Sequence, residues 1–330
     1  MSAYSATYIR TLVEQVLAEL DLGEVKTEPG STTPDHGHDA TTQPTDQARY
    51  SKQSPAHSPS ATSITQDAIN VSDPTTSEMR HRSRVQHPHN GAGLDNLVAS
   101  TNARIGVGRA GPRPRTSELL LFQADHAVTQ DAIFGDVPTD LLDQFGLFIV
   151  QSQAANEEEY LLRPDLGRLL STGSKTTIDD RCIKSPQVQI VVGDGLSAAA
   201  VTNNLDKIYP VLNQGLSSAG LSLGTPFFVQ RCRVGIMNDI NSVIGADVIV
   251  LIIGERPGLG VADALSVYSG WRPAPGKTDA HRDVVCMITD HGGTNPLEAG
   301  AYVVDHVLDV ISQQVSGVEL RLHRSDESSR

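Results

Sequence analysis

The clearest apolar pattern of this chain lies in its C-terminal half, where short continuous apolar runs alternate with amphipathic stretches. Continuous runs predict strands that are covered on both faces, and apolar residues three and four positions apart predict helices. We expect strands at residues 188–192, 227–230, 247–253, 264–268 and 284–289. Helices are expected at residues 197–219 and 236–244, and a last one begins at Pro296. This alternation over residues 172–330 predicts an α/β fold with a mostly parallel sheet covered by helices on both faces.

Residues 99–171 have a different pattern and are expected to form a small helical subdomain before the sheet. Helical stretches are predicted at residues 117–134, 139–145 and 165–170, with breaks between them. The chain thus contains one sizeable α/β core and a smaller helical part.

Two further segments precede this body. Residues 1–22 predict a short amphipathic helix, because apolar residues share one face: Ile9, Leu12, Val13, Val16, Leu17 and Leu20. Residues 23–98 are rich in Ser, Thr, Pro, His, Gln and Asp, and such a composition buries too little surface to offset its ordering entropy. We expect a disordered linker, whose irregularly spaced histidines favour solvated polar residues over a metal-binding tract. The first helix either binds a partner groove or docks on the body.

Composition narrows the class of function. The formal net charge of -13 disfavours nucleic acid and anionic membrane surfaces as partners. The 3 cysteines are far apart and lack the spacing of a zinc site, which favours reduced thiols in a cytosolic protein. The longest apolar run, residues 248–253, is too short to span a membrane, and no signal peptide is predicted. Small ligands and other proteins remain as partners.

The glycine pattern at residues 106–111 matches GxGxxG, but its surroundings do not suit a nucleotide loop. That fingerprint needs a strand before it and a helix within it, whereas Pro112 and Pro114 obstruct a helix here. The loop also carries Arg104, Arg109, Arg113 and Arg115. These arginines either meet carboxylates across a subunit contact or are solvated surface residues.

Two turns follow predicted strands. In GDGLS (193–197), Ser197 is placed to cap the next helix rather than to act as a hydrolase nucleophile, and Asp194 is expected to face whatever lies above the sheet. In DHGG (290–293), His291 is either a catalytic residue or part of a capping turn. The capping turn is favoured, because the sequence offers no nucleophile or acid to pair with His291.

The turn GERPGLG (254–260) follows the most apolar strand. Glu255 and Arg256 lie at its carboxyl end, and Gly258 and Gly260 allow a bulky ligand to approach the backbone. Taken alone, the turn favours a strand-end ion pair over a ligand site.

A set of motifs that occur in the same order as in a known family changes the interpretation of these turns. The set comprises RIGVGRAGPRPRT (104–116), LLLFQADHAVTQD (119–131), RPDLGR (163–168), GDGLS (193–197), GTPFFV (224–229), GERPGLG (254–260) and HGGTNPLEAGAYVVD (291–305). Together these motifs resemble the small subunit of ethanolamine ammonia-lyase over roughly residues 100–325. The resemblance implies a two-subunit, adenosylcobalamin-dependent lyase that converts ethanolamine to acetaldehyde and ammonia by a radical mechanism.

Within such an enzyme, the large subunit would hold the substrate, and this subunit would cover and orient the cofactor without catalytic residues of its own. The family's cobalamin contacts match Val234, Glu255 and Cys286. Glu255 and the Val234 carbonyl would accept hydrogen bonds from corrin amides, and Cys286 would pack against the cofactor. Arg231 and Arg233 would flank it. The chain lacks DxHxxG, so the cofactor is expected to keep its own dimethylbenzimidazole ligand.

The resemblance also bears on partners. Residues 99–171 are expected to contact the large subunit within a hetero-oligomer. Residues 1–22 resemble tags that direct enzymes into bacterial microcompartments, where a shell protein would receive them; otherwise the location is cytoplasmic. The rival interpretation is a noncatalytic α/β binding or scaffold subunit.

Overall fold

The structure, a computed structural model, describes residues 77–101 and 103–328. The helix predicted at residues 1–22 and most of the predicted linker lie outside the described residues. At the end of that linker the prediction was wrong, because α2 (Ser77–Arg80) and α3 (Gly91–Ala99) are helical. Asn90 caps α3 by accepting a hydrogen bond from Gly93 N at 2.9 Å, and α3 itself, GAGLDNLVA, is less polar than the rest of the predicted linker.

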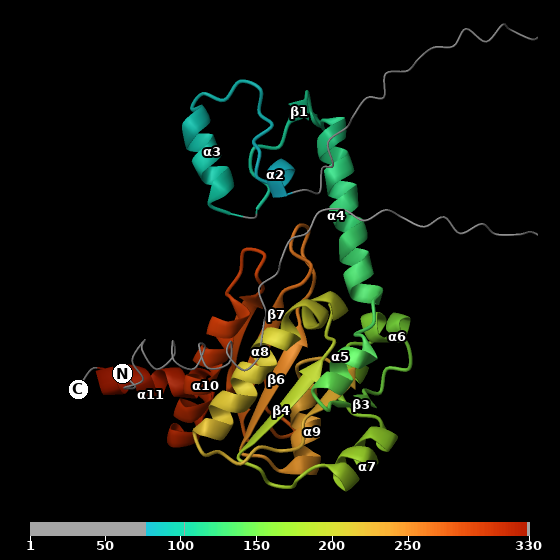
Figure 1. The fold of residues 1–330 in the computed structure, drawn as a ribbon, viewed down its shortest axis with the longest axis vertical. Coiled ribbons are helices and arrows are strands. Elements are labelled where there is room, and N and C mark those ends of the chain that lie inside the picture. Colours follow the sequence, from blue (N-terminus) through green and yellow to red (C-terminus); the bar gives the residue numbers. More distant parts are fainter. Residues whose placement is uncertain (1–76, 102, 329–330) are drawn as a thin grey trace, which may run out of the picture. The chain divides into compact units, whose positions relative to one another are not determined.

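Six strands form one sheet in the order β3-β5-β4-β6-β7-β8 (Figure 1). Their bounds are β3 Phe148–Gln151, β4 Val188–Gly193, β5 Phe227–Gln230, β6 Val248–Gly254, β7 Leu265–Trp271 and β8 Arg282–Ile288. The first four in this order run parallel, whereas β7 and β8 each run antiparallel to the preceding strand. The α/β class is confirmed, and the sheet is mixed.

Three strands differ from their predicted setting. β3 lies in the segment predicted as a helical subdomain, yet it pairs with β5 and forms one edge of the sheet. β7 and β8 reverse direction because the connections on either side of β7 contain only the 3-10 turn η2 (Asp279–His281), which is too short for a crossover to a parallel strand.

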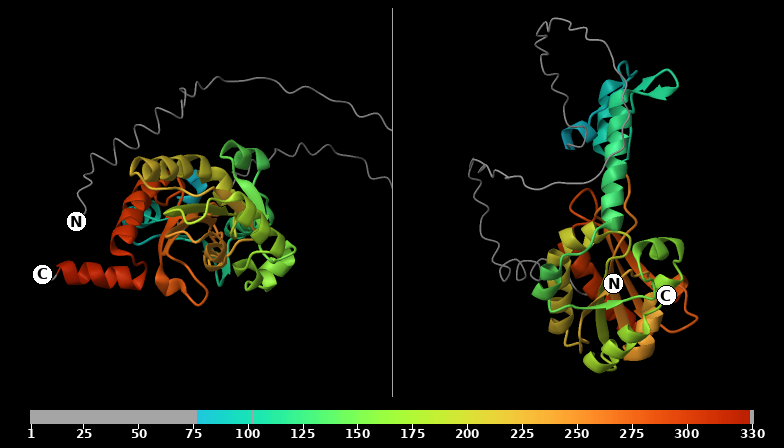
Figure 2. Two further views of the ribbon diagram at one scale, coloured as in Figure 1. Left: turned by 90° about the horizontal axis from the view of Figure 1, so that it is seen from below. Right: turned by 90° about the vertical axis from the view of Figure 1, so that its right-hand side faces the viewer.

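Helices cover both faces of the sheet (Figure 1 and Figure 2). On one face, α8 (Ala198–Ser218) and α10 (Pro296–Gln313) contribute to a core with the side chains of β4, β6 and β7. On the other face, α7 (Thr172–Arg181) and α9 (Ile236–Ile244) close a second core. The strands β4 and β6 are buried along their whole length, which explains their continuous apolar sequence.

The remaining elements flank the sheet. A two-stranded hairpin, β1 (Arg109–Ala110) and β2 (Arg113–Pro114), precedes α4 (Thr116–Phe134). α5 (Thr139–Gln144), α6 (Glu157–Leu162) and the 3-10 turn η1 (Leu166–Arg168) surround β3, and α11 (Val318–Ser328) ends the described chain. Among the described residues, no helix is both long and apolar enough to cross a membrane.

Candidate functional site

The structure brings three separately predicted residues into one cavity. Val234, Glu255 and Cys286 all line a cavity of about 430 Å³ at one edge of the sheet. Val234 lies in the turn after β5, Glu255 directly follows β6, and Cys286 lies on β8. Because the parallel strands β4, β5 and β6 end at the same edge, residues far apart in sequence meet there.

Glu255 is held by the two strands that follow it. Its Oε1 accepts hydrogen bonds from Ser266 Oγ on β7 and from Met287 N on β8, the latter at 2.8 Å. Met287 has a φ of 55°, where β8 is irregular, and the bond to Glu255 helps to hold this strained backbone. Glu255 forms no ion pair with any described residue, so the strand-end ion pair favoured by the isolated motif was wrong.

Glycines allow the turns after β4 and β6 to lie against each other. A Cβ on Gly254 would lie 2.2 Å from Ser197 O, and one on Gly195 would lie 2.1 Å from Gly254 O. Gly195 also has a φ of 60°. Ser197 caps α8 as predicted, accepting from Ala200 N at 3.1 Å. The glycines of these two motifs therefore shape the floor of the cavity.

The turn that carries Val234 is anchored to Asp194. Asp194 accepts hydrogen bonds from Arg231 N at 2.6 Å and from Cys232 N at 2.9 Å. Burial raises the pKa of the Asp194 carboxyl to about 7, although the two N–H donors act to lower it. Asp194 was expected to face whatever lies above the sheet, and what it contacts there is the turn after β5.

Tyr160, on α6, is a site residue that the sequence analysis did not identify. Its hydroxyl lies 2.5 Å from Gly195 O and 2.7 Å from Cys232 O, so its single proton is shared between two turns. The Arg233 guanidinium stacks over the Tyr160 ring, 4.2 Å from its centroid. Burial raises the pKa of this tyrosine well above its usual range, which keeps the hydroxyl protonated.

A second cavity, of about 600 Å³, adjoins the first and shares Arg233, Val234 and Tyr268 with it. Its lining carries four basic side chains, Arg168, Arg233, Lys277 and Arg282, and two acidic ones, Asp239 and Asp279. Arg282 pairs with Asp279 within the chain. The remaining excess of positive charge favours an anionic ligand.

Cys286 is an exposed free thiol, whereas Cys182 and Cys232 are buried. No cluster of three or more His, Cys, Asp or Glu side chains suited to a metal ion occurs in the described part of the chain. Cys286 is therefore accessible in the cavity that it lines.

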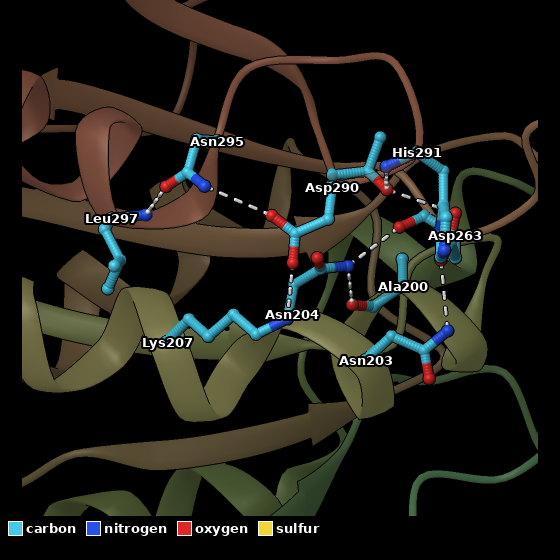
Figure 3. Close-up of polar contacts among 10 residues, drawn as sticks. Ala200, Asn203, Asn204, Lys207, Asp263, Asp290, His291, Asn295 and Leu297 are labelled. Carbon is cyan, nitrogen blue, oxygen red and sulfur yellow. Dashed lines mark hydrogen bonds and ion pairs between the residues drawn. The ribbon is translucent and has the colours of Figure 1, made fainter. Parts of the chain in front are cut away.

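His291 has an acidic partner that the sequence analysis did not find. Its Nδ1 lies 2.8 Å from Asp263 Oδ2, and Asn203 Nδ2 donates to the same oxygen at 3.1 Å (Figure 3). Asp263 is 28 positions from His291, so no local pattern indicated the pair. The neighbouring Asp290 pairs with Lys207 of α8 (Figure 3). These contacts tie the turn after β8 to α8. The cap of the following helix is Asn295, outside the predicted capping turn, and it accepts from Leu297 N at 2.9 Å.

The loop at residues 106–111 has no features of a nucleotide site. It leads into the β1-β2 hairpin rather than a helix, as its prolines predicted. Of its arginines, Arg104 pairs with the buried Asp125 of α4, and Arg115 Nε donates to Arg109 O at 3.2 Å. Part of this arginine set therefore stabilises the chain's own fold.

Residues 92–321 match a known protein family, described as ethanolamine ammonia-lyase light chain (EutC). The matched region contains all six strands of the sheet and every residue that lines the two cavities.

Proposed function

Since this chain belongs to the ethanolamine ammonia-lyase light chain family, we propose that it covers and orients adenosylcobalamin for the conversion of ethanolamine to acetaldehyde and ammonia. A light chain implies a heavy-chain partner, so the enzyme is a hetero-oligomer. The observation that carries the proposal is the convergence of Val234, Glu255 and Cys286 on one cavity. When bound, adenosylcobalamin would supply the radical chemistry of the reaction, and this chain would supply binding and orientation.

The polar groups of the cavity suit the rim of a corrin ring, which carries amide side chains. Glu255 uses Oε1 for its own chain, which leaves Oε2 without a donor from the described residues. The Val234 carbonyl accepts one long hydrogen bond, from Met237 N at 3.3 Å, and a carbonyl oxygen has a second lone pair. Both groups can therefore accept from amides.

The adjoining basic cavity suits the nucleotide tail of the same cofactor. That tail contains a phosphodiester, and the lining of this cavity carries more basic than acidic side chains. Arg233 lines both cavities, so it lies where the ring and the tail would join. This arrangement favours a subunit that binds cobalamin with its nucleotide tail over the rival interpretation, a scaffold subunit that binds no ligand. It suits a cofactor that retains its own lower base.

The surface of α4 is a candidate contact with the heavy chain. Five of its large apolar residues are exposed: Leu119, Leu120, Phe122, Val128 and Phe134. Exposed apolar residues gathered on one element are typical of a subunit interface. Replacing Leu119 and Leu120 with Ser should reduce co-purification of the heavy chain, whereas Leu322→Ser on α11 serves as an exposed control.

A role of residues 1–22 in microcompartment targeting stays a prediction, since they lie outside the described residues. Deleting residues 1–22 should leave lyase assembly intact and abolish encapsulation. Loss of assembly would instead favour a helix that docks on the body.

The central experiment is a cobalamin titration of the co-expressed heavy and light chains, followed by visible absorbance and by acetaldehyde formation. Glu255→Gln should weaken cofactor binding, because the amide replaces an anionic acceptor and places a donor among donors. Glu319→Gln, an exposed residue of α11, is the matched control. The proposal fails if the wild-type complex neither binds cobalamin nor forms acetaldehyde.

A further inference from the structure

The turn formed by residues 231–234 carries one wall of the cavity, yet its backbone is strained. Arg231 has a φ of 56°, a left-handed conformation that is unfavourable for a residue other than glycine. The same residue and the next donate their N–H groups to opposite oxygens of the Asp194 carboxylate, at 2.6 and 2.9 Å. Asp194 thus holds two successive amides in the orientation that the strained turn requires.

Tyr160 provides a second clamp between the same two segments. Its hydroxyl bridges Gly195 O, next to Asp194, and Cys232 O. Arg233 Nη2 donates to Tyr160 O at 3.1 Å, and Arg233 N donates to Gly167 O at 2.8 Å. The backbone is therefore fixed on the residues that immediately precede Val234.

We propose that Asp194 is a positioning residue whose ionised carboxylate holds residues 231–234 in the conformation that binds the cofactor, so that protonation of Asp194 weakens cofactor binding. This inference rests on the proposed cobalamin function and extends it to a residue outside the family's known contacts. The reason is geometric: a carboxylate accepts at both oxygens, whereas a protonated carboxyl presents a hydrogen toward one of the two N–H donors.

The charges around Asp194 place this protonation near neutral pH. Burial, with a smaller contribution from Glu157 of α6, raises its pKa to about 7 against the opposing N–H groups of Cys232 and Arg231. Glu157 is itself paired with Arg231 Nε at 2.8 Å. Cys232 and Tyr160 face the carboxyl as neutral groups, because burial raises the pKa of both. Asp194 should therefore change from accepting two hydrogen bonds to accepting one at a pH close to neutral, where an enzyme normally works.

The test is cobalamin affinity of the assembled heavy and light chains between pH 6 and 8.5, with cyanocobalamin as the probe. Wild-type affinity should fall by up to about tenfold per pH unit below pH 7, the limit for one linked proton. Asp194→Asn should bind at least about tenfold more weakly at pH 8, with affinity that no longer depends on pH. Its kcat at saturating adenosylcobalamin should stay within about twofold of wild type.

Asp179→Asn, an exposed residue of α7 paired with Lys184, is the matched control and should keep the wild-type profile. If Asp194→Asn does not assemble, the wild type and Tyr160→Phe test the proposal instead. The proposal then requires that wild-type cobalamin affinity depends on pH and that Tyr160→Phe binds cobalamin more weakly. If either result is absent, the proposal is overturned. Wild-type affinity in Asp194→Asn also overturns it. Absence of cobalamin binding by the wild type at pH 8 would instead contradict the proposed function.

Discussion

Asp263 Oδ2 lies 2.8 Å from His291 Nδ1 and joins the loop after β6 to the turn after β8. The other oxygen of this carboxylate accepts from Thr289 Oγ1 at 3.2 Å, and Asn204 Nδ2 donates to the Asp263 carbonyl at 2.9 Å. Asp263 is 8% exposed, whereas the His291 side chain is 70% exposed. The buried carboxylate is therefore the centre of this network, and the imidazole is one of several donors on it.

This asymmetry predicts unequal effects of two substitutions. Asp263→Ala should lower the free energy of unfolding by about 1–3 kcal/mol, because it leaves Thr289 and Asn203 without their acceptor. His291→Ala should cost below about 1 kcal/mol, since its ring is mostly solvated. Urea denaturation of the isolated light chain measures both. A larger loss for His291→Ala would show that the histidine, rather than the carboxylate, organises the turn.

The contact between the turns after β4 and β6 predicts that Gly254 tolerates no side chain. A Cβ at this position would lie 2.2 Å from Ser197 O and 2.3 Å from Asp194 O, both backbone atoms that cannot move aside separately. Gly254→Ala should therefore prevent assembly of a stable light chain or lower its melting temperature strongly. Gly173→Ala is the control, because no atom lies within 4 Å of its Cβ position and it lies in α7. It should be neutral or raise stability by up to about 1 kcal/mol.

Much of the fold could be predicted because its strands are buried on both faces. The bounds of β5 and α9 agree with the predicted ranges 227–230 and 236–244. β3 was missed because its four residues alternate between buried and exposed and lie among helices. The directions of β7 and β8 were missed because an apolar run does not show which way a strand runs in the sheet. The lack of a predicted helix between them could have indicated an antiparallel pair, since parallel neighbours need a long crossover.

The residues of the candidate site could likewise be predicted only in part. Val234, Glu255 and Cys286 could be named because a family resemblance linked segments that no local pattern links. Asp194 was noted only as a residue at a strand end, and Tyr160 was not noted at all. Their roles depend on contacts with residues 37 and 35 positions away, respectively, which only the three-dimensional fold reveals.

The raised pKa of Asp194 also predicts how stability depends on pH. The pKa is 3.8 as the ordinary value and about 7 in the folded chain, so between these values the folded state binds more protons than the unfolded state. The contribution of Asp194 to the free energy of unfolding should therefore fall as the pH rises from about 4 to about 7, and level off above. Subtracting the denaturation profile of Asp194→Asn from that of the wild type isolates this slope. A difference that rises with pH would contradict the sign.

The unequal burial of the cysteines gives a direct test of where the cofactor lies. Cys286 is exposed, whereas burial raises the pKa of Cys182 to about 11 and that of Cys232 well above its usual value, which suppresses their thiolates. A thiol reagent should therefore label Cys286 first in the folded light chain, and Cys286→Ser should abolish the fast phase. In the assembled enzyme, cobalamin should slow this labelling by covering the cavity that Cys286 lines. Cys286→Ser should still bind cobalamin, because the serine side chain fits the space of the thiol. Equal labelling with and without bound cobalamin, in a complex whose Cys286 remains accessible, would place the cofactor away from this cavity.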